Sequence, residues 1–299
     1  MIRLQAGAAH ACIAEEGAEI VEWVVGGKPL LWRKDPAVWN ETAPLLFPVV
    51  GWTKNHQVRV GAKCYPLGLH GFARYRTFRV AEQGDDCVRL TLASDADTRA
   101  LYPFEFSLSV DVRLGEATIS VEIGVANCGT GPMPYACGLH PGFRWPFAGG
   151  APENYLLRFA EPEDPLVPVI APGGLISPER RRLPLAGRVL HLAASLFQND
   201  ALCFLNAASR EIRFEAPDGS AIVVAAENFP HFGIWCHPGH GYLCIEEWTG
   251  YSDPENFSGD LFEKPSMLVL APGASGRHRA TFTYAAAPHP LAELRKPDR

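Results

Sequence analysis

Three short stretches of the chain contain residue types suited to proton chemistry. The first places an imidazole four residues before a guanidinium, the second carries another imidazole, and the third carries a carboxylate. Together these groups can deliver, remove and orient protons on a neutral polar substrate. The residues concerned are His70, Arg74, His140 and Glu246.

Each imidazole is followed by a residue that shapes the backbone. Gly71 follows His70 and allows another part of the chain to approach closely. Pro141 follows His140, where it fixes the backbone and removes a hydrogen-bond donor. The alternative interpretation of the first stretch is a histidine satisfied by backbone at a loop–strand junction, with Arg74 on the surface.

The carboxylate continues a strand-like apolar run at 242–245. If side chains alternate along this strand, Cys244 and Glu246 face one side and Glu247 points away, as the expected solvent-facing acid. A carboxylate on a buried strand is unfavourable unless it is paired or functional. Glu246 is therefore the candidate functional carboxylate. The alternative interpretation is that Glu246 ends the strand and is exposed to solvent.

Other chemistries have weaker support in the sequence. A metal site is an alternative for His231, His237 and His240, although nothing fixes their geometry. The eight cysteines include no CxxC pair, which leaves metal frameworks and thioredoxin-like chemistry unsupported. We find no GxSxG, no P-loop and no GxGxxG.

Composition limits the partners and the compartment. The 299 residues carry a net charge of −6, which argues against nucleic acid or an anionic membrane as the main partner. The one tight basic run, 180–182, is expected to be a solvated loop, with a phosphate-binding patch as the alternative. There is no convincing signal peptide and no apolar stretch near the roughly 20 residues that cross a bilayer. We expect a cytoplasmic protein, either a monomer or a homodimer.

Hydrophobic alternation indicates the fold class. Residues 104–114 and 117–125 alternate apolar and polar with a period of two, which a helix cannot hold on one face. Hairpins are also expected within 8–25 and 78–92, and at Asp218-Gly219. No amphipathic helix of ten or more residues is evident. The prediction is an all-β fold of antiparallel sheets, a single domain over 1–299 with a frayed tail at 286–299.

The ordered motifs LHGFAR at 69–74, GLHPGF at 138–143 and CIEEW at 244–248 resemble those of the aldose 1-epimerases, the galactose mutarotase-like proteins. The similarity is strongest to the LacX-like branch and covers nearly the whole chain. It implies a large antiparallel β-sandwich of the galactose mutarotase type, with a sugar in a cleft on one sheet and no cofactor. Further matching segments are Trp32, Trp39, 44–51, 196–200, 229–230, 234–235 and 272–273.

The resemblance also implies roles for individual residues. His140 would be the general acid that protonates the pyranose ring oxygen, and Glu246 the general base that removes the anomeric hydroxyl proton. His70 and Arg74 would hold sugar hydroxyls or the ring oxygen, and Asp200 matches the acidic sugar-binding position. The expected reaction is the interconversion of α and β anomers of an aldohexose or a hexose 6-phosphate.

Two departures from the family pattern bear on the substrate. Trp52 stands where members often have arginine, and Glu247 where the branch usually has proline. One alternative function is a non-catalytic carbohydrate-binding protein that retains the cleft. Another is a glycoside hydrolase or lyase on a related sandwich, which would require two opposed carboxylates. Arg74 and the 180–182 run leave a sugar 6-phosphate open as substrate.

Overall fold

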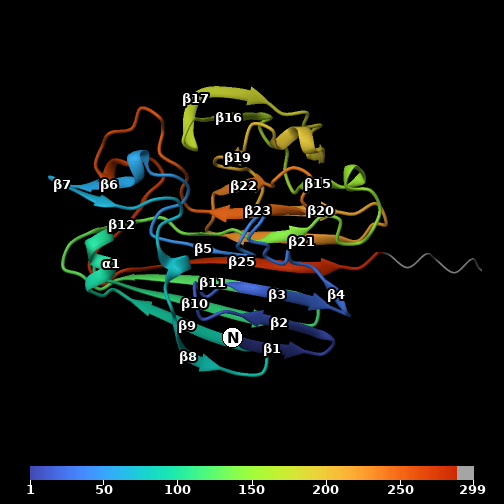
Figure 1. The fold of residues 1–299 in the computed structure, drawn as a ribbon, viewed down its shortest axis with the longest axis horizontal. Coiled ribbons are helices and arrows are strands. Elements are labelled where there is room, and N and C mark those ends of the chain that lie inside the picture. Colours follow the sequence, from blue (N-terminus) through green and yellow to red (C-terminus); the bar gives the residue numbers. More distant parts are fainter. Residues whose placement is uncertain (288–299) are drawn as a thin grey trace, which may run out of the picture.

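Strands dominate the structure, a computed structural model that describes residues 1–287. The last part of the predicted tail, 288–299, lies outside the described residues. The largest sheet has nine antiparallel strands. In spatial order its strands are β18 (Val189–His191), β15 (Leu156–Phe159), β20 (Glu211–Glu215), β21 (Ala221–Glu227), β25 (Ser275–Ala285), β11 (Thr118–Asn127), β10 (Phe106–Leu114), β9 (Cys87–Ala93) and β8 (Arg79–Gln83). In Figure 1 this sheet extends from β8 at the bottom, through β25 in the middle, to β20 and β15 above.

A six-stranded sheet carries two of the three motif-bearing segments, and the third, 69–74, lies beside strand β5 of this sheet, where Gly71 forms a bridge with Phe47. Its central strand, β23, pairs with β22 on one side and with β13 and β14 on the other. Its strands are β19 (Leu202–Phe204), β22 (His231–Trp235), β23 (Tyr242–Trp248), β13 (Gly138–Leu139), β5 (Leu45–Leu46) and β14 (Gly142–Arg144).

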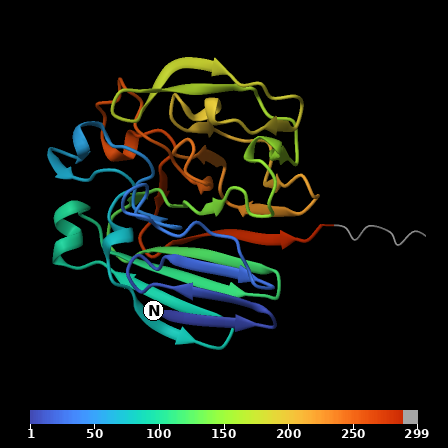
Figure 2. The ribbon, with the colours of Figure 1, turned by 45° about the vertical axis from the view of Figure 1, so that its right-hand side comes forward.

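Smaller sheets complete the architecture. The N-terminal strands lie alongside the nine-stranded sheet, and the hairpin β16–β17 lies at the opposite end of the molecule, beyond the six-stranded sheet (Figures 1 and 2). These sheets consist of β1 (Ile2–Ala6), β2 (Ala9–Ile13), β3 (Ile20–Val25) and β4 (Lys28–Pro29); β16 (Leu166–Ala171) and β17 (Leu175–Arg182); β6 (Gln57–Val60) and β7 (Lys63–Pro66); and β12 (Met133–Tyr135) and β24 (Leu268–Leu270).

Helical structure is limited to short segments among the described residues. The α-helix α1 spans Ala96–Leu101, and Asp95 caps it by accepting a hydrogen bond from the Thr98 N–H. The 3₁₀ turns are η1 (Lys54–His56), η2 (Ala73–Tyr75), η3 (Pro152–Asn154), η4 (Ala194–Phe197) and η5 (Leu261–Glu263).

The strand pairings follow the predicted alternation. β10 and β11 form a long antiparallel hairpin with Leu114 opposite Ile119, and their inward-facing apolar side chains are buried. The opening hairpin pairs β2 with β3, β8 pairs with β9, and Asp218-Gly219 joins β20 to β21. The prediction of an all-β antiparallel sandwich is confirmed.

The prediction of a loop at 180–182 is wrong. These residues end strand β17 and pair with β16, where Arg181 lies opposite Val167. A proline-rich surface segment can still satisfy its backbone polar groups by forming a two-stranded hairpin. The guanidinium groups of two of these arginines donate hydrogen bonds to backbone carbonyls. Arg180 donates to the carbonyl of Leu166. Arg181 donates to the carbonyls of Leu196, Asp200 and Ala201.

Candidate functional site

All five residues selected from the sequence line one cleft of about 340 Å³ on the six-stranded sheet. This volume lies at the lower end of the range of roughly 300–1,000 Å³ for small-molecule sites. The residues come from loops and strands that are distant in the sequence, so the fold brings the three motifs together. They are His70, Arg74, His140, Asp200 and Glu246.

His140 leaves the short strand β13 and points into the cleft. Its backbone N–H donates to the carbonyl of Pro44 over 3.2 Å. Its Nε2 lies 3.1 Å from Oε2 of Glu246. The rings of Trp39 and Trp235 lie 5.2 and 5.8 Å from the imidazole, centroid to centroid. Two indoles and a carboxylate thus fix the orientation of this histidine.

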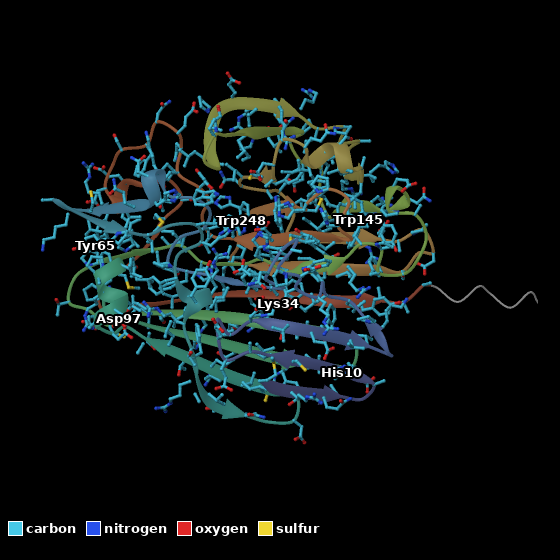
Figure 3. The ribbon with its side chains drawn as sticks, viewed as in Figure 1. His10, Lys34, Tyr65, Asp97, Trp145 and Trp248 are labelled. Carbon is cyan, nitrogen blue, oxygen red and sulfur yellow. The ribbon has the colours of Figure 1, made fainter. Side chains whose placement is uncertain are left out.

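Glu246 projects from the central strand β23 and is almost fully buried, with 1% of its surface exposed. Its Oε2 accepts a 3.1 Å hydrogen bond from the indole Nε1–H of Trp248, two residues along the same face. Trp248 lies on the same strand, above the long hairpin β10–β11 in the view of Figure 3. The carboxylate is therefore held from one side by an indole and contacts His140 with the same oxygen.

Gly233 on the neighbouring strand β22 makes room for this indole. A Cβ atom built at Gly233 would lie 2.2 Å from the ring of Trp248, far inside van der Waals contact. Gly233 pairs directly with Glu246 across the two strands. The absence of a side chain at this position therefore lets the indole lie across β22 and reach the carboxylate.

Burial shifts the acid–base properties of the pair in opposite directions. It lowers the pKa of His140 below its ordinary value and raises the pKa of Glu246 well above its own, although the Trp248 hydrogen bond lowers the latter. Both directions disfavour an isolated charge in the cleft. One proton can move between the two groups without changing their net charge, because imidazolium–carboxylate and imidazole–carboxylic acid are both neutral overall.

His70 lies on a left-handed backbone (φ 60°) beside His140. Its Nδ1 accepts the N–H of Gly51 over 3.0 Å, so the neutral ring carries its proton on Nε2. The two imidazoles are perpendicular, with centroids 5.4 Å apart. The predicted close approach at Gly71 is confirmed, because a Cβ there would lie 2.2 Å from the carbonyl oxygen of Phe47.

Arg74 is not on the surface, because only 9% of its side chain is exposed. It donates to Oε2 of Glu41 over 3.0 Å and to the carbonyl of Leu69 over 3.3 Å, and its buried Nε has no partner. Burial raises the pKa of Glu41, and the charge of Arg74 lowers it. The pair presents a guanidinium and a carboxyl group to the cleft.

Asp200 lies on the exposed rim of the cleft. It has a left-handed backbone (φ 69°), and its Oδ1 accepts the N–H of the next residue, Ala201, over 2.7 Å. Its second carboxylate oxygen has no protein hydrogen-bond partner among those found for residues 1–287. Asp200 therefore borders the cleft without joining the buried group around Glu246.

The prediction that Glu247 faces solvent is wrong. It does point away from Glu246, but its exposed fraction is 0% and neither carboxylate oxygen has a hydrogen-bond partner. It pairs with Leu139 on one side and Phe232 on the other, in the layer covered by the main hydrophobic core. Burial and the neighbouring Glu246 raise the pKa of Glu247 well above its ordinary value. The face of β23 that carries Glu247 is turned toward the main core and does not meet solvent.

Sequence reasoning missed several groups that complete the site. The pairing of Glu41 with Arg74 and the roles of Gly233 and Trp248 were not expected. A signal existed for Trp248 only, because a residue two positions from Glu246 on a strand shares its face. Glu41 and Gly233 are brought to the site by tertiary contacts that carry no local pattern.

The described residues contain no candidate metal-binding site. Within residues 1–287, no group of three or more His, Cys, Asp or Glu side chains is arranged to hold a metal ion. His231, one of the three clustered histidines, accepts the N–H of Asn206 at its Nδ1 over 2.9 Å. No helix in the same range is long and apolar enough to span a bilayer.

The chain is similar in sequence to one known family of proteins. A family model described as Aldose 1-epimerase matches residues 1–283. The plasmid and chromosomal forms of Protein LacX from Lactococcus lactis subsp. lactis are each 30% identical over 257 residues, which cover 82% of this chain and 86% of the relative.

Solved structures agree with this match. A galactose mutarotase related enzyme from Lactobacillus acidophilus superposes with a TM-score of 0.88 at 28% identity, covering 96% of this chain and 97% of that one. A galactose mutarotase-like protein from Lactobacillus casei ATCC 334 gives a TM-score of 0.88 at 29% identity, covering 95% and 99%.

Proposed function

Because the chain belongs to the aldose 1-epimerase family of carbohydrate isomerases, we propose that it is a mutarotase that interconverts the α and β anomers of an aldose by acid–base ring opening. The observation that carries the proposal is the 3.1 Å contact between His140 Nε2 and Glu246 Oε2 inside the cleft. A hemiacetal presents its ring oxygen and its anomeric hydroxyl on one carbon. An acid and a base that serve both oxygens must therefore lie side by side, as these two atoms do.

In the proposed reaction, the imidazolium of His140 gives its Nε2 proton to the ring oxygen while the carboxylate of Glu246 removes the proton of the anomeric hydroxyl. The bond between C1 and the ring oxygen breaks, and the open-chain aldehyde forms. Rotation about the C1–C2 bond and reclosure by the reverse proton transfers give the other anomer. Each positioned acid or base contributes typically about 10²–10⁴-fold to the rate.

The pKa directions are compatible with this cycle. Burial lowers the pKa of His140, which makes its imidazolium a stronger acid, and raises the pKa of Glu246, which makes its carboxylate a stronger base. The imidazolium–carboxylate form arises by moving one proton from Glu246 to His140 across their contact. Ring opening then returns the pair to imidazole and carboxylic acid, so net charge is unchanged throughout.

The surrounding groups would orient the sugar. His70 can donate from Nε2, because its Nδ1 accepts the Gly51 N–H. Arg74 and Glu41 supply donors and acceptors for hydroxyl groups, and Asp200 would contribute an acceptor at the rim. The rings of Trp39 and Trp235, which flank His140, offer flat surfaces for the C–H face of a pyranose.

Polarimetry with freshly dissolved α-glucose and α-galactose tests the proposal. We expect the protein to accelerate the approach to anomeric equilibrium, and His140→Asn and Glu246→Gln to abolish this acceleration while their circular dichroism spectra stay unchanged. Sugar binding without acceleration by the parent protein would identify a carbohydrate-binding protein and overturn the proposal. Parental rates in either variant would overturn the assigned roles.

A further inference from the structure

One wall of the cleft is hydrophobic and is built separately from the main core. A second, smaller cluster of buried apolar side chains lies beside the six-stranded sheet, and partly buried residues from the hairpin β16–β17 and the loop after β23 pack against it. Seven residues of this apolar wall line the cleft: Val50, Ile170, Ile176, Ala201, Cys203, Trp248 and Tyr251.

Trp52 closes the apolar wall where it meets the hairpin. A Cβ atom built at Gly174, in the turn between β16 and β17, would lie 1.9 Å from the indole of Trp52, so the ring lies directly against the turn. The backbone of Trp52 is fixed as well, because its N–H donates to Oγ of Ser252 over 2.9 Å and its carbonyl accepts the N–H of Asp253 over 2.8 Å. Trp52 therefore presents a fixed indole to the cleft.

The charges around the cleft oppose a phosphorylated ligand. Among the described residues that line it, Arg74 is the sole lysine or arginine, and it already pairs with Glu41 at 3.0 Å. Arg181 at the hairpin donates to three backbone carbonyls and does not line the cleft. Glu246 and Asp200 add acidic groups to the lining. A phosphate would therefore meet acidic groups and hydrocarbon without a cation of its own.

On the basis of the proposed function, we infer that the protein prefers neutral aldoses that carry no polar or charged group at C6, such as a 6-deoxyhexose or a pentose, and that it rejects a 6-phosphate. Every ring carbon of an aldohexopyranose except C5 bears a hydroxyl group, so the C5 substituent is the one exocyclic part of the sugar that can be apolar. The apolar wall is the part of the cleft that suits such a substituent. A methyl group there gains contact with hydrocarbon, whereas a phosphate is desolvated without compensation.

The test is exchange NMR of anomer interconversion for two matched series. One series is galactose, 6-deoxygalactose, arabinose and galactose 6-phosphate, and the other is the corresponding set built on glucose. Within the series that the protein accelerates, we expect kcat/KM for the 6-deoxy sugar to equal or exceed that of the parent hexose. We expect the 6-phosphate to fall at least about 100-fold below it, because a dianion would be buried without a partner.

Variants of the apolar wall test which residues cause the preference for the 6-deoxy sugar and the discrimination against the 6-phosphate. Trp52→Arg should raise the ratio of 6-phosphate to parent hexose by about tenfold or more, because it adds a cation to the wall. Trp52→Phe, which keeps the wall apolar, should leave that ratio unchanged. Ile170→Thr leaves the contact between Trp52 and the hairpin in place and should lower the preference for the 6-deoxy sugar.

The outcomes separate this inference from the proposed function. If no sugar in either series is accelerated, the mutarotase proposal fails and the inference fails with it. If the 6-phosphate is processed as fast as the parent hexose or faster, the inference is overturned while the mutarotase proposal stands. If the expected order appears but neither Trp52→Arg nor Ile170→Thr alters it, the apolar wall is not its cause.

Discussion

Trp248 holds Glu246 by a 3.1 Å hydrogen bond from its indole Nε1–H to carboxylate Oε2, the oxygen that also contacts His140. The donor and the acceptor lie two residues apart on one face of strand β23. A base fixed in this way needs no rotation to meet a substrate proton, and its carboxylate form is favoured by the donated hydrogen bond. The indole is thus a positioning group for the proposed base.

Replacing Trp248 by phenylalanine tests this role. Trp248→Phe removes the hydrogen bond that lowers the pKa of Glu246, so this pKa should rise further. We expect kcat/KM for mutarotation to drop by about 10–100-fold, the equivalent of about 1.4–2.7 kcal/mol. The alkaline limb of its pH profile should move to higher pH, because the pair loses its shared proton only when Glu246 ionises. The pH dependence of kcat/KM measures both effects.

Trp145→Phe is the matched control for this prediction. It removes an indole hydrogen bond of similar length, 2.9 Å to the carbonyl of Pro152. Trp145 does not line the cleft and is labelled apart from Trp248 in Figure 3. This variant should leave the pH profile unshifted. A Trp248→Phe profile that superimposes on the parental one would show that the indole merely fills space.

Gly233→Ala should displace the same indole by steric contact. The new methyl would fall within 2.2 Å of the Trp248 ring, and overpacking of this kind destabilises proteins by typically about 1–3 kcal/mol. We expect a lower free energy of unfolding in urea together with reduced mutarotase activity. Gly131→Ala is the control, because a Cβ there meets no atom within 4 Å. Equal stability of the two variants would contradict the packing argument.

Arg74 and Glu41 are expected to act as a unit. Removing one partner leaves a buried group uncompensated, which typically costs about 3–5 kcal/mol for a fully buried pair, whereas removing both is far less harmful. Arg74→Met and Glu41→Gln should each destabilise the protein, and the double variant should be more stable than Arg74→Met alone. Urea unfolding of the parent, the two single variants and the double variant measures the coupling energy. Strictly additive changes in the free energy of unfolding would show that the 3.0 Å contact does not contribute to stability.

The sequence predicts the parts of this molecule that have a local period. The alternation at 104–125 predicts the hairpin β10–β11, and the same alternation places Glu246 and Glu247 on opposite faces of β23. It does not reveal what covers each face. Glu247 is buried because the main core closes over it, and this depends on strands that are remote in the sequence.

For the site, too, the sequence predicts the residues in local motifs but not their tertiary contacts. The three motifs and their resemblance to one family lead to His70, Arg74, His140, Asp200 and Glu246, all of which line the cleft. The contacts that orient them arise only when the chain folds. Arg74 meets Glu41 across 33 residues of sequence, and Trp52 meets Ser252 across 200. Contacts between residues so far apart in the sequence leave no periodicity or motif from which they could be predicted.

Glu247 leads to a prediction about stability and pH. Its pKa in the folded protein is raised above the ordinary value by burial, so the folded state binds more protons than the unfolded state between the two pKa values. Its contribution to stability is therefore present below the unfolded pKa and is lost as pH rises through the folded one. The free energy of unfolding should fall as pH is raised from mildly acidic to mildly alkaline.

Glu247→Leu removes this titration and the unsatisfied carboxyl oxygens. We expect the variant to be more stable than the parent at neutral pH by about 1–3 kcal/mol, the penalty of an unpaired buried polar group. The gain should widen as pH rises, because the parent alone then suffers from ionising this side chain. Glu16→Leu, at an exposed acid of the opening hairpin, is the control and should show no such widening. Urea unfolding across the pH range decides the matter: a parallel offset between parent and Glu247→Leu would mean that Glu247 does not titrate with folding.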